Sequence, residues 1–161
     1  DEHSKKNELP VDYVLRMAIE KSEVLVVNSN DFLITADTIV VEGKNILHKV
    51  EDRQKAKGYL RQLSGTTHKV YTAFNIKHKK KNYCGIEKTL LKMKYLTDFE
   101  IDCYLDKNEW QGKAGGYGIQ GLAGKFFPVV KGCFPNVIGL PLSRLDNVLK
   151  GIGFYRVDAD E

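Results

Sequence analysis

Apolar positions between residues 9 and 27 recur every three or four residues, which is the spacing of one face of a helix. Pro10 falls in the first turn, where its missing N–H costs no hydrogen bond. The polar residues 28–31 then interrupt the pattern. The spacing therefore predicts a helix over residues 9–27, and its stripe comprises Val11, Val14, Leu15, Ala18, Ser22 and Leu25.

Apolar runs at residues 32–34 and 39–41 predict one buried strand, and a tight turn at residues 42–45 makes it part of a hairpin. Residues 69–76 alternate between apolar and polar side chains, and residues 83–95 run back after a lysine-rich turn. A shorter strand is predicted over residues 126–130. These patterns predict a sheet in which several strands are linked by hairpins.

Three more helices are predicted between these strands. Asp52 can cap the first, Thr97 and Glu100 form a capping box at the second, and Pro141 starts the third. Because helices and strands interleave, we predict an α/β fold with helices flanking a mixed sheet. No repeat or linker divides the chain, so residues 1–161 are expected to form a single domain.

Composition excludes several classes of protein. The chain has 161 residues, is 42% hydrophobic and 29% charged, and carries a net charge of +4. It can bury about 70% of the surface that its unfolded chain exposes, and its composition is not that of a disordered or fibrous protein. No apolar run is long enough to span a membrane, and three widely spaced cysteines indicate neither a disulfide framework nor a zinc site. We therefore expect a cytoplasmic protein.

Asp37 and Lys21 are the first residues that suggest chemistry. Asp37 lies between the two apolar runs of the first strand, where a carboxylate must be paired, hydrogen-bonded or metal-bound. A structural Asp that caps a local turn is an equally good interpretation of that position. Lys21 lies on the apolar stripe of the first helix, so it either extends to solvent or reaches into a cleft toward an anion.

Six of the 14 glycines lie between residues 112 and 124. Such a loop exposes backbone N–H groups and allows a ligand to approach closely. It contains a formal dinucleotide-binding pattern, which we reject because no strand precedes it, no helix follows and no acidic partner lies about twenty residues on. The sequence thus offers an acid in a strand, lysines that face it and a glycine loop. This combination suits the binding and hydrolysis of a phosphorylated ligand with a divalent ion.

Lysines also cluster at residues 77–81, around His78. A nucleic-acid-binding patch would fit the charge, but a solvated hairpin turn explains it better, because no aromatic residues are interleaved as in single-strand-binding proteins. We therefore expect no nucleic-acid partner and no membrane association.

Six motifs taken in order resemble the Maf family of nucleoside triphosphate pyrophosphatases, and the resemblance covers nearly the whole chain. They are Tyr13-Val14-Leu15-Arg16-Met17-Ala18-x-x-Lys21, Ala36-Asp37-Thr38-Ile39-Val40, Leu47-His48-Lys49, Leu63-Ser64-Gly65-x-x-His68-x-Val70, Lys113-Ala114-Gly115-Gly116-Tyr117-Gly118-Ile119-Gln120-Gly121 and Asn136-Val137-Ile138-Gly139-Leu140-Pro141-Leu142. The resemblance implies a fold related to the inosine-triphosphate pyrophosphatase group, with two lobes around a cleft. It also implies hydrolysis of a nucleoside triphosphate to the monophosphate and pyrophosphate.

The resemblance also implies roles for individual residues. Asp37 falls on the family's proton acceptor, and Glu2 aligns with a second functional acid, so the pair would hold a divalent cation, Mg²⁺ or Mn²⁺. Lys21 and Lys49 match lysines that hold the triphosphate. Two further residues, Thr38 and Gln120, fall on positions associated with base selectivity. The form of the glycine loop is similar to the subgroup acting on dTTP and UTP rather than on 7-methyl-GTP.

Two features depart from the family pattern. His48 and Val50 flank Lys49, where the family has Gly and Pro. The family also has a Ser-x-Ser-x-Arg-Arg loop ahead of the acidic pair, whereas this sequence starts at that pair, so we expect either an N-terminally truncated fragment or a weakened or inactive relative. The alternatives to a dTTP/UTP pyrophosphatase are therefore a non-catalytic nucleotide-binding remnant and a purine-directed pyrophosphatase. The sequence is also compatible with a homodimer.

Overall fold

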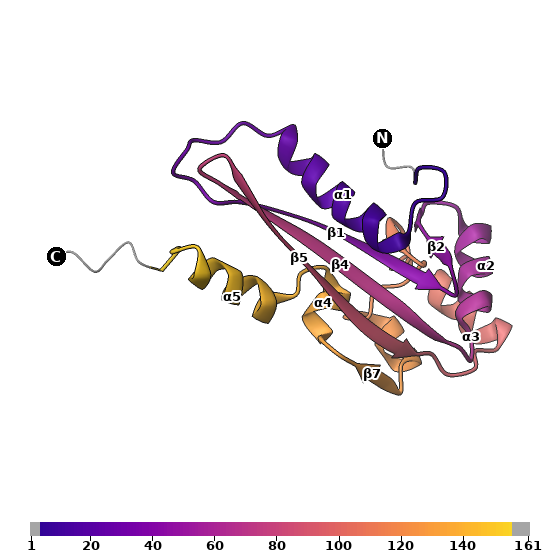
Figure 1. The fold of residues 1–161 in the computed structure, drawn as a ribbon. Helices are drawn as coiled ribbons and strands as arrows, with labels where there is room; N and C mark the ends of the chain where they lie inside the picture. The colour runs from indigo at the N-terminus through magenta and orange to yellow at the C-terminus, as the bar shows by residue number, and fades with distance from the viewer. Residues whose placement is uncertain (1–3, 156–161) are drawn as a thin grey trace.

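The computed structural model describes residues 4–155, in which helices and strands follow one another along the chain (Figure 1). The helices are α1 (Pro10–Glu23), α2 (Arg53–Leu63), α3 (Asp98–Leu105), α4 (Phe134–Ile138) and α5 (Leu142–Gly151), with a 3-10 helix, η1, at Leu122–Phe126. The strands are β1 (Leu33–Glu42), β2 (Asn45–Leu47), β3 (Lys49–Val50), β4 (Thr67–His78), β5 (Lys81–Lys92), β6 (Lys113–Ala114) and β7 (Val129–Lys131). Among the described residues, no helix has the length and apolar character needed to span a bilayer.

Five strands form the main sheet in the order β2-β1-β4-β5-β7. The predicted α/β class, with helices flanking a sheet, is confirmed. The sequence predicted a mixed sheet, whereas every pairing within the described part of this sheet is antiparallel. The connections explain this arrangement. Tight turns join β1 to β2 and β4 to β5, and after α2 the chain returns as β4, which lies on the edge of β1 away from β2 and runs opposite to β1.

The two faces of the sheet carry separate apolar cores, because neighbouring side chains of a strand point to opposite faces. On one face, α1 lies across the sheet (Figure 1), and Ile39 and Val41 of β1 form a core with residues of this helix. On the other face, Val40 and Val70 belong to a larger core with residues of α2, α3 and η1. α5 covers the next part of that face, over Phe74 and Ile76 of β4.

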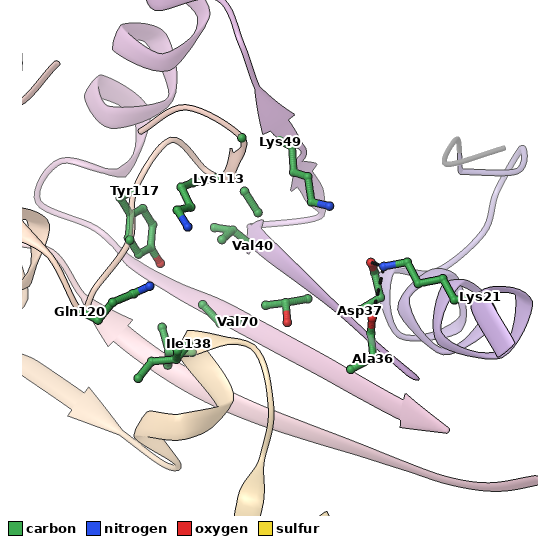
Figure 2. A pocket seen from close by; sticks show the side chains of 15 residues that line it. Lys21, Ala36, Asp37, Val40, Lys49, Val70, Lys113, Tyr117, Gln120 and Ile138 are labelled. Atoms are coloured by element: carbon green, nitrogen blue, oxygen red, sulfur yellow. Dashed lines mark hydrogen bonds and ion pairs between the residues drawn. The ribbon is translucent and has the colours of Figure 1, made fainter. Parts of the chain in front are cut away.

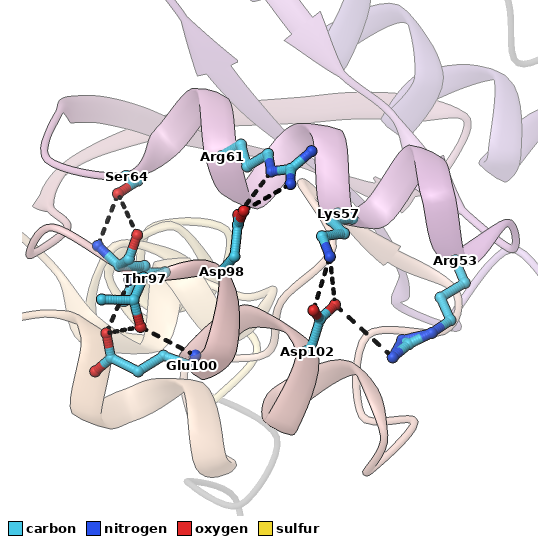
Figure 3. A network of polar contacts seen from close by, with 9 residues as sticks. Arg53, Lys57, Arg61, Ser64, Thr97, Asp98, Glu100 and Asp102 are labelled. Carbon is cyan, nitrogen blue, oxygen red and sulfur yellow. Dashed lines mark hydrogen bonds and ion pairs between the residues drawn. The ribbon is translucent and has the colours of Figure 1, made fainter.

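α2 and α3 lie side by side and are joined along their exposed edges by ion pairs (Figure 3). Lys57 Nζ lies 2.6 Å from Asp102 Oδ1, and Arg61 Nε lies 2.8 Å from Asp98 Oδ1. Thr97 and Glu100 form the predicted capping box at the start of α3. Exposed ion pairs contribute only about 0–1 kcal/mol each, so the buried apolar core beneath them dominates the packing.

Several short elements differ from the sequence-based expectation. α1 ends at Glu23 rather than at residue 27, and the strand predicted over 126–130 is instead the end of η1 followed by β7. β6 does precede the glycine loop, contrary to our reason for rejecting a dinucleotide fold, but η1 rather than an α-helix follows it. β3 and β6 form a separate two-stranded sheet, pairing Lys49 with Ala114. Elements of two residues are too short to produce a periodic pattern.

Candidate active site

The site lies along a stretch of β1 that is paired with β4 on one edge but not with β2 on the other. β4 pairs with β1 from residue 33 to residue 41, but β2 pairs only with residues 40–42 on the other edge. After Leu47 the chain leaves β1 and pairs with β6 through β3. Residues 33–39 of β1 therefore have no strand partner on this edge within the described structure, and Asp37 and Thr38 lie in that open stretch.

Asp37 forms an ion pair with Lys21 at this edge. The Lys21 Nζ atom donates to Asp37 Oδ1 at 2.5 Å and to the Ala36 carbonyl oxygen at 3.2 Å (Figure 2). The Asp37 side chain is 10% exposed, and that of Lys21 is 37% exposed. Lys21 therefore turns from α1 toward the sheet instead of extending into solvent, and it places a positive charge beside a largely buried carboxylate.

A cavity of about 250 Å³ extends from this ion pair along the sheet. Asp37 and Lys21 lie at one end, while Tyr117 and Gln120 of the glycine loop lie at the other (Figure 2). Its wall combines these polar groups with apolar side chains, which include Val40, Val70, Val137 and Ile138. A flat ring with apolar faces and polar edges suits this space.

A second cavity, of about 410 Å³, adjoins the first at Asp37. It shares Asp37, Thr38, Lys49 and Ala114 with the first cavity, so the two form one continuous cleft with Asp37 and Thr38 at the junction. The second cavity is lined in addition by Tyr13, Ile39, Leu47, His48 and Lys55.

The charge of the cleft is predominantly positive. Lys21, Lys49, Lys55 and Lys113 line one or both cavities, whereas Asp37 is the single carboxylate among their described lining residues. Ammonium groups around a lone acid favour an anionic ligand such as a phosphate chain.

Thr38 is held by a chain of buried hydrogen bonds. Its hydroxyl lies 2.8 Å from that of Thr72 on β4, and Thr72 Oγ1 donates to the Asn136 carbonyl oxygen at 2.8 Å. The Asn136 side chain in turn donates to the Val70 carbonyl and to Thr89 Oγ1. This chain fixes α4, which carries Val137 and Ile138 of the cavity wall, against β4 and β5.

The glycine loop packs closely against β1 at Gly115 and against α2 at Gly116. Gly115 and Gly116 have φ angles of 68° and 75°, in the left-handed region that glycine adopts without strain. A Cβ atom at Gly115 would lie only 3.1 Å from Val40 Cγ1. This turn directs the following residue, Tyr117, into the first cavity (Figure 2).

The five predicted site residues within the described structure, Lys21, Asp37, Thr38, Lys49 and Gln120, all line the first cavity. Their chemical roles remain predictions. Glu2, which was predicted to hold metal with Asp37, lies outside the described residues.

Sequence reasoning missed Lys55 and Tyr117 as parts of the site, and it noted Lys113 only as a polar side chain of the glycine loop. Lys55 is in the first turn of α2, and a basic residue at that position of a surface helix has no distinguishing pattern. Tyr117 and Lys113 lie within the quoted glycine-loop motif, so their proximity to Gln120 was an available indication.

Comparison with known proteins places these features in a family. Residues 1–152 match the family model described as "Maf-like protein". The chain is 38% identical over 161 residues to a protein of Cereibacter sphaeroides named dTTP/UTP pyrophosphatase, covering 99% of this chain and 84% of the relative. Proteins of the same name from Caulobacter vibrioides and Zymomonas mobilis are 40% and 41% identical, each over 96% of this chain and over 81% and 77% of the relatives. The chain belongs to the Maf-like protein family.

Proposed function

We propose that the protein hydrolyses dTTP and UTP to the nucleoside monophosphate and pyrophosphate. The observation that carries the proposal is the position of Asp37, where a cavity with Val70, Val137 and Ile138 in its wall meets a second cavity lined by Lys49 and Lys55. A nucleotide with its base in the first cavity and its phosphate chain toward Lys49 and Lys55 would bring the α-phosphate to Asp37. The names of the relatives support this substrate class.

In the proposed reaction, the Asp37 carboxylate accepts a proton from a water molecule whose oxygen attacks the α-phosphorus. The bond between that phosphorus and the oxygen bridging to the β-phosphorus breaks, and pyrophosphate leaves with the bridging oxygen. Lys21 would hold the carboxylate in position through its 2.5 Å hydrogen bond to Oδ1. Lys49 and Lys55 would bind the charge of the departing pyrophosphate.

A divalent cation fits this site only as a partner of the substrate. The described residues contain no group of three or more His, Cys, Asp or Glu side chains that could hold a metal ion. Mg²⁺ is commonly bound by one or two carboxylates together with substrate phosphates, so Asp37 would be its ligand here, with Glu2 as the proposed second one. When bound, the ion would neutralise charge on the phosphates.

Asp37→Asn tests the assignment directly. We expect pyrophosphate release from dTTP and UTP, with Mg²⁺ or Mn²⁺, to fall by about 10²–10⁴-fold, because the amide cannot accept the proton. Asp31→Asn, in the loop between α1 and β1 and away from both cavities, is the matched control and keeps wild-type turnover. Near-normal hydrolysis by the Asp37 variant would refute the proposed role.

The same assay separates the alternative functions. Binding of UTP without pyrophosphate release from any triphosphate would identify a non-catalytic nucleotide-binding protein. Preferential hydrolysis of ITP would identify a purine-directed enzyme. We also propose that the chain forms a single domain, which a single cooperative transition in denaturant unfolding would test. We propose a cytoplasmic location, which cell fractionation tests, and a homodimer, which light scattering tests.

A further inference from the structure

Tyr117 and His68 form a buried pair at the closed end of the first cavity. The Tyr117 hydroxyl oxygen lies 2.7 Å from His68 Nε2. Tyr117 is 5% exposed and lines the cavity, whereas His68 is 1% exposed and projects from β4 on the same face as Val70. Phe127 packs against both rings, at centroid distances of 4.8 Å to Tyr117 and 5.9 Å to His68, so the pair is held by side chains from three parts of the chain.

The surroundings of His68 favour one of its two neutral tautomers. Burial lowers the pKa of His68 from 6.5 to about 4, so the ring is neutral near pH 7 and has one N–H group. Its Nδ1 atom is buried and has no hydrogen-bond partner among the described residues. An N–H group buried without an acceptor is rarer in proteins than an unused acceptor. This favours the tautomer with the proton on Nε2, in which His68 donates to the Tyr117 oxygen and the O–H of Tyr117, which lines the cavity, can be satisfied by a ligand.

This direction leaves the Tyr117 O–H as an unused donor. Burial raises the pKa of Tyr117 well above its ordinary value, so the hydroxyl keeps its proton. His68 is its one hydrogen-bond partner within residues 4–155. Figure 2 shows the Tyr117 oxygen pointing toward the cavity, on the same side as the amide of Gln120. A ligand atom that accepts a hydrogen bond would satisfy this donor.

We propose that Tyr117, oriented by His68, is a specificity-determining residue that donates a hydrogen bond to O4 of a uracil or thymine base. The inference rests on the proposed function for the substrate class. In a pyrimidine ring, C4 lies opposite N1, which carries the ribose. A base whose ribose faces Asp37 therefore presents its C4 substituent to the closed end, where Tyr117 lies (Figure 2). Uracil and thymine have an acceptor there, whereas cytosine has an amino donor.

The test uses UTP and the triphosphate of the 2-pyrimidinone riboside, which lacks O4 and also the N3–H donor of uracil. We expect the wild-type protein to prefer UTP by at least about tenfold in kcat/KM, and Tyr117→Phe to reduce this preference by about tenfold by lowering the value for UTP alone, because only the contact with O4 is lost. Tyr83→Phe, which removes a hydroxyl from β5 outside both cavities, is the matched control and keeps the preference.

His68 is tested as a positioning residue. His68→Leu should lower the preference for UTP while inhibition by pyrophosphate, which reports on Lys49 and Lys55 in the second cavity, stays unchanged. His68→Gln retains an N–H donor and should restore part of the preference. A general loss of structure would weaken pyrophosphate inhibition as well, and that result would overturn the positioning role.

Calorimetric binding of UMP and the 2-pyrimidinone riboside monophosphate separates this inference from the proposed function. A protein that hydrolyses UTP but whose preference is unchanged by Tyr117→Phe would overturn the inference alone. A wild-type protein without turnover, which still binds UMP more tightly through Tyr117, would overturn the hydrolysis and support the inference.

Discussion

Replacing Asn136 by alanine removes the side chain that fastens α4 to the sheet behind the cleft. Asn136 is fully buried, and its Nδ2 atom donates to the Val70 carbonyl at 3.2 Å and to Thr89 Oγ1 at 2.9 Å. Two buried hydrogen bonds at about 0.5–1.5 kcal/mol each, together with the space left by the amide, lower the free energy of unfolding by about 2–3 kcal/mol. The Oδ1 atom lacks a partner among the described residues, and its removal offsets a small part of this loss.

Urea unfolding followed by tryptophan fluorescence measures the effect. Trp110 is the only tryptophan of the chain and is buried in the larger core, so its emission reports on loss of that core. We expect a lower midpoint at an unchanged slope, and a melting temperature lower by about 5–10 °C for a chain of this size. Asn147→Ala, at an exposed position of α5, is the control and should stay within about 0.5 kcal/mol of wild type.

A double-mutant cycle with Thr89→Val isolates the hydrogen bond between the two side chains. The removal of both groups together should cost about 1 kcal/mol less than the sum of the two single changes. An Asn136→Ala protein as stable as the Asn147→Ala control, or a cycle that is strictly additive, would refute the view that this side chain fastens α4.

Two further predictions concern the sheet and its buried histidine. Gly85→Ala should lower the free energy of unfolding in urea by about 1–3 kcal/mol, because the new Cβ would overlap the ring of the fully buried Phe74; full stability would mean that Phe74 moves freely. Burial lowers the pKa of His68 from 6.5 to about 4 in the folded protein, so as the pH falls the unfolded chain binds a proton at this residue before the folded one does. The free energy of unfolding should therefore decrease by about 2 kcal/mol between pH 7 and pH 5. His68→Gln should remove that slope from urea midpoints measured at the two pH values; an unchanged slope would assign it to other groups.

The sequence predicted the parts of the site that lie on long, periodic elements. The two apolar runs around Asp37 made β1 a buried strand, and the position of Lys21 on the stripe of α1 allowed it to face that strand. Both are local patterns of regular spacing. The pattern left open whether Lys21 extends to solvent or reaches inward, and its hydrogen bond to Asp37 answers that question.

Such local patterns do not predict contacts between segments that are distant in the sequence. Tyr117 and His68 are separated by 49 residues, and their pairing depends on how the glycine loop packs on β4. The antiparallel order of the sheet likewise depends on which side of β1 the chain returns to after α2, and both choices suit the same amphipathic helix. α4 and the β3–β6 pair are too short to show a period.

The short β2 strand explains why a site exists on an otherwise continuous sheet. An open strand edge carries unpaired backbone groups and invites pairing with other chains. Here the edge of β1 around Asp37 is instead covered by a side chain, since Lys21 donates to the Ala36 carbonyl oxygen, and it is bordered by cavities. A β2 strand that continued past Leu47 along β1 would satisfy the same edge, but its backbone would take the space that the cleft now occupies next to Asp37 and Thr38. The departure of the chain toward β6 therefore gives up strand pairing at the point where a buried acid and its lysines need access to a ligand.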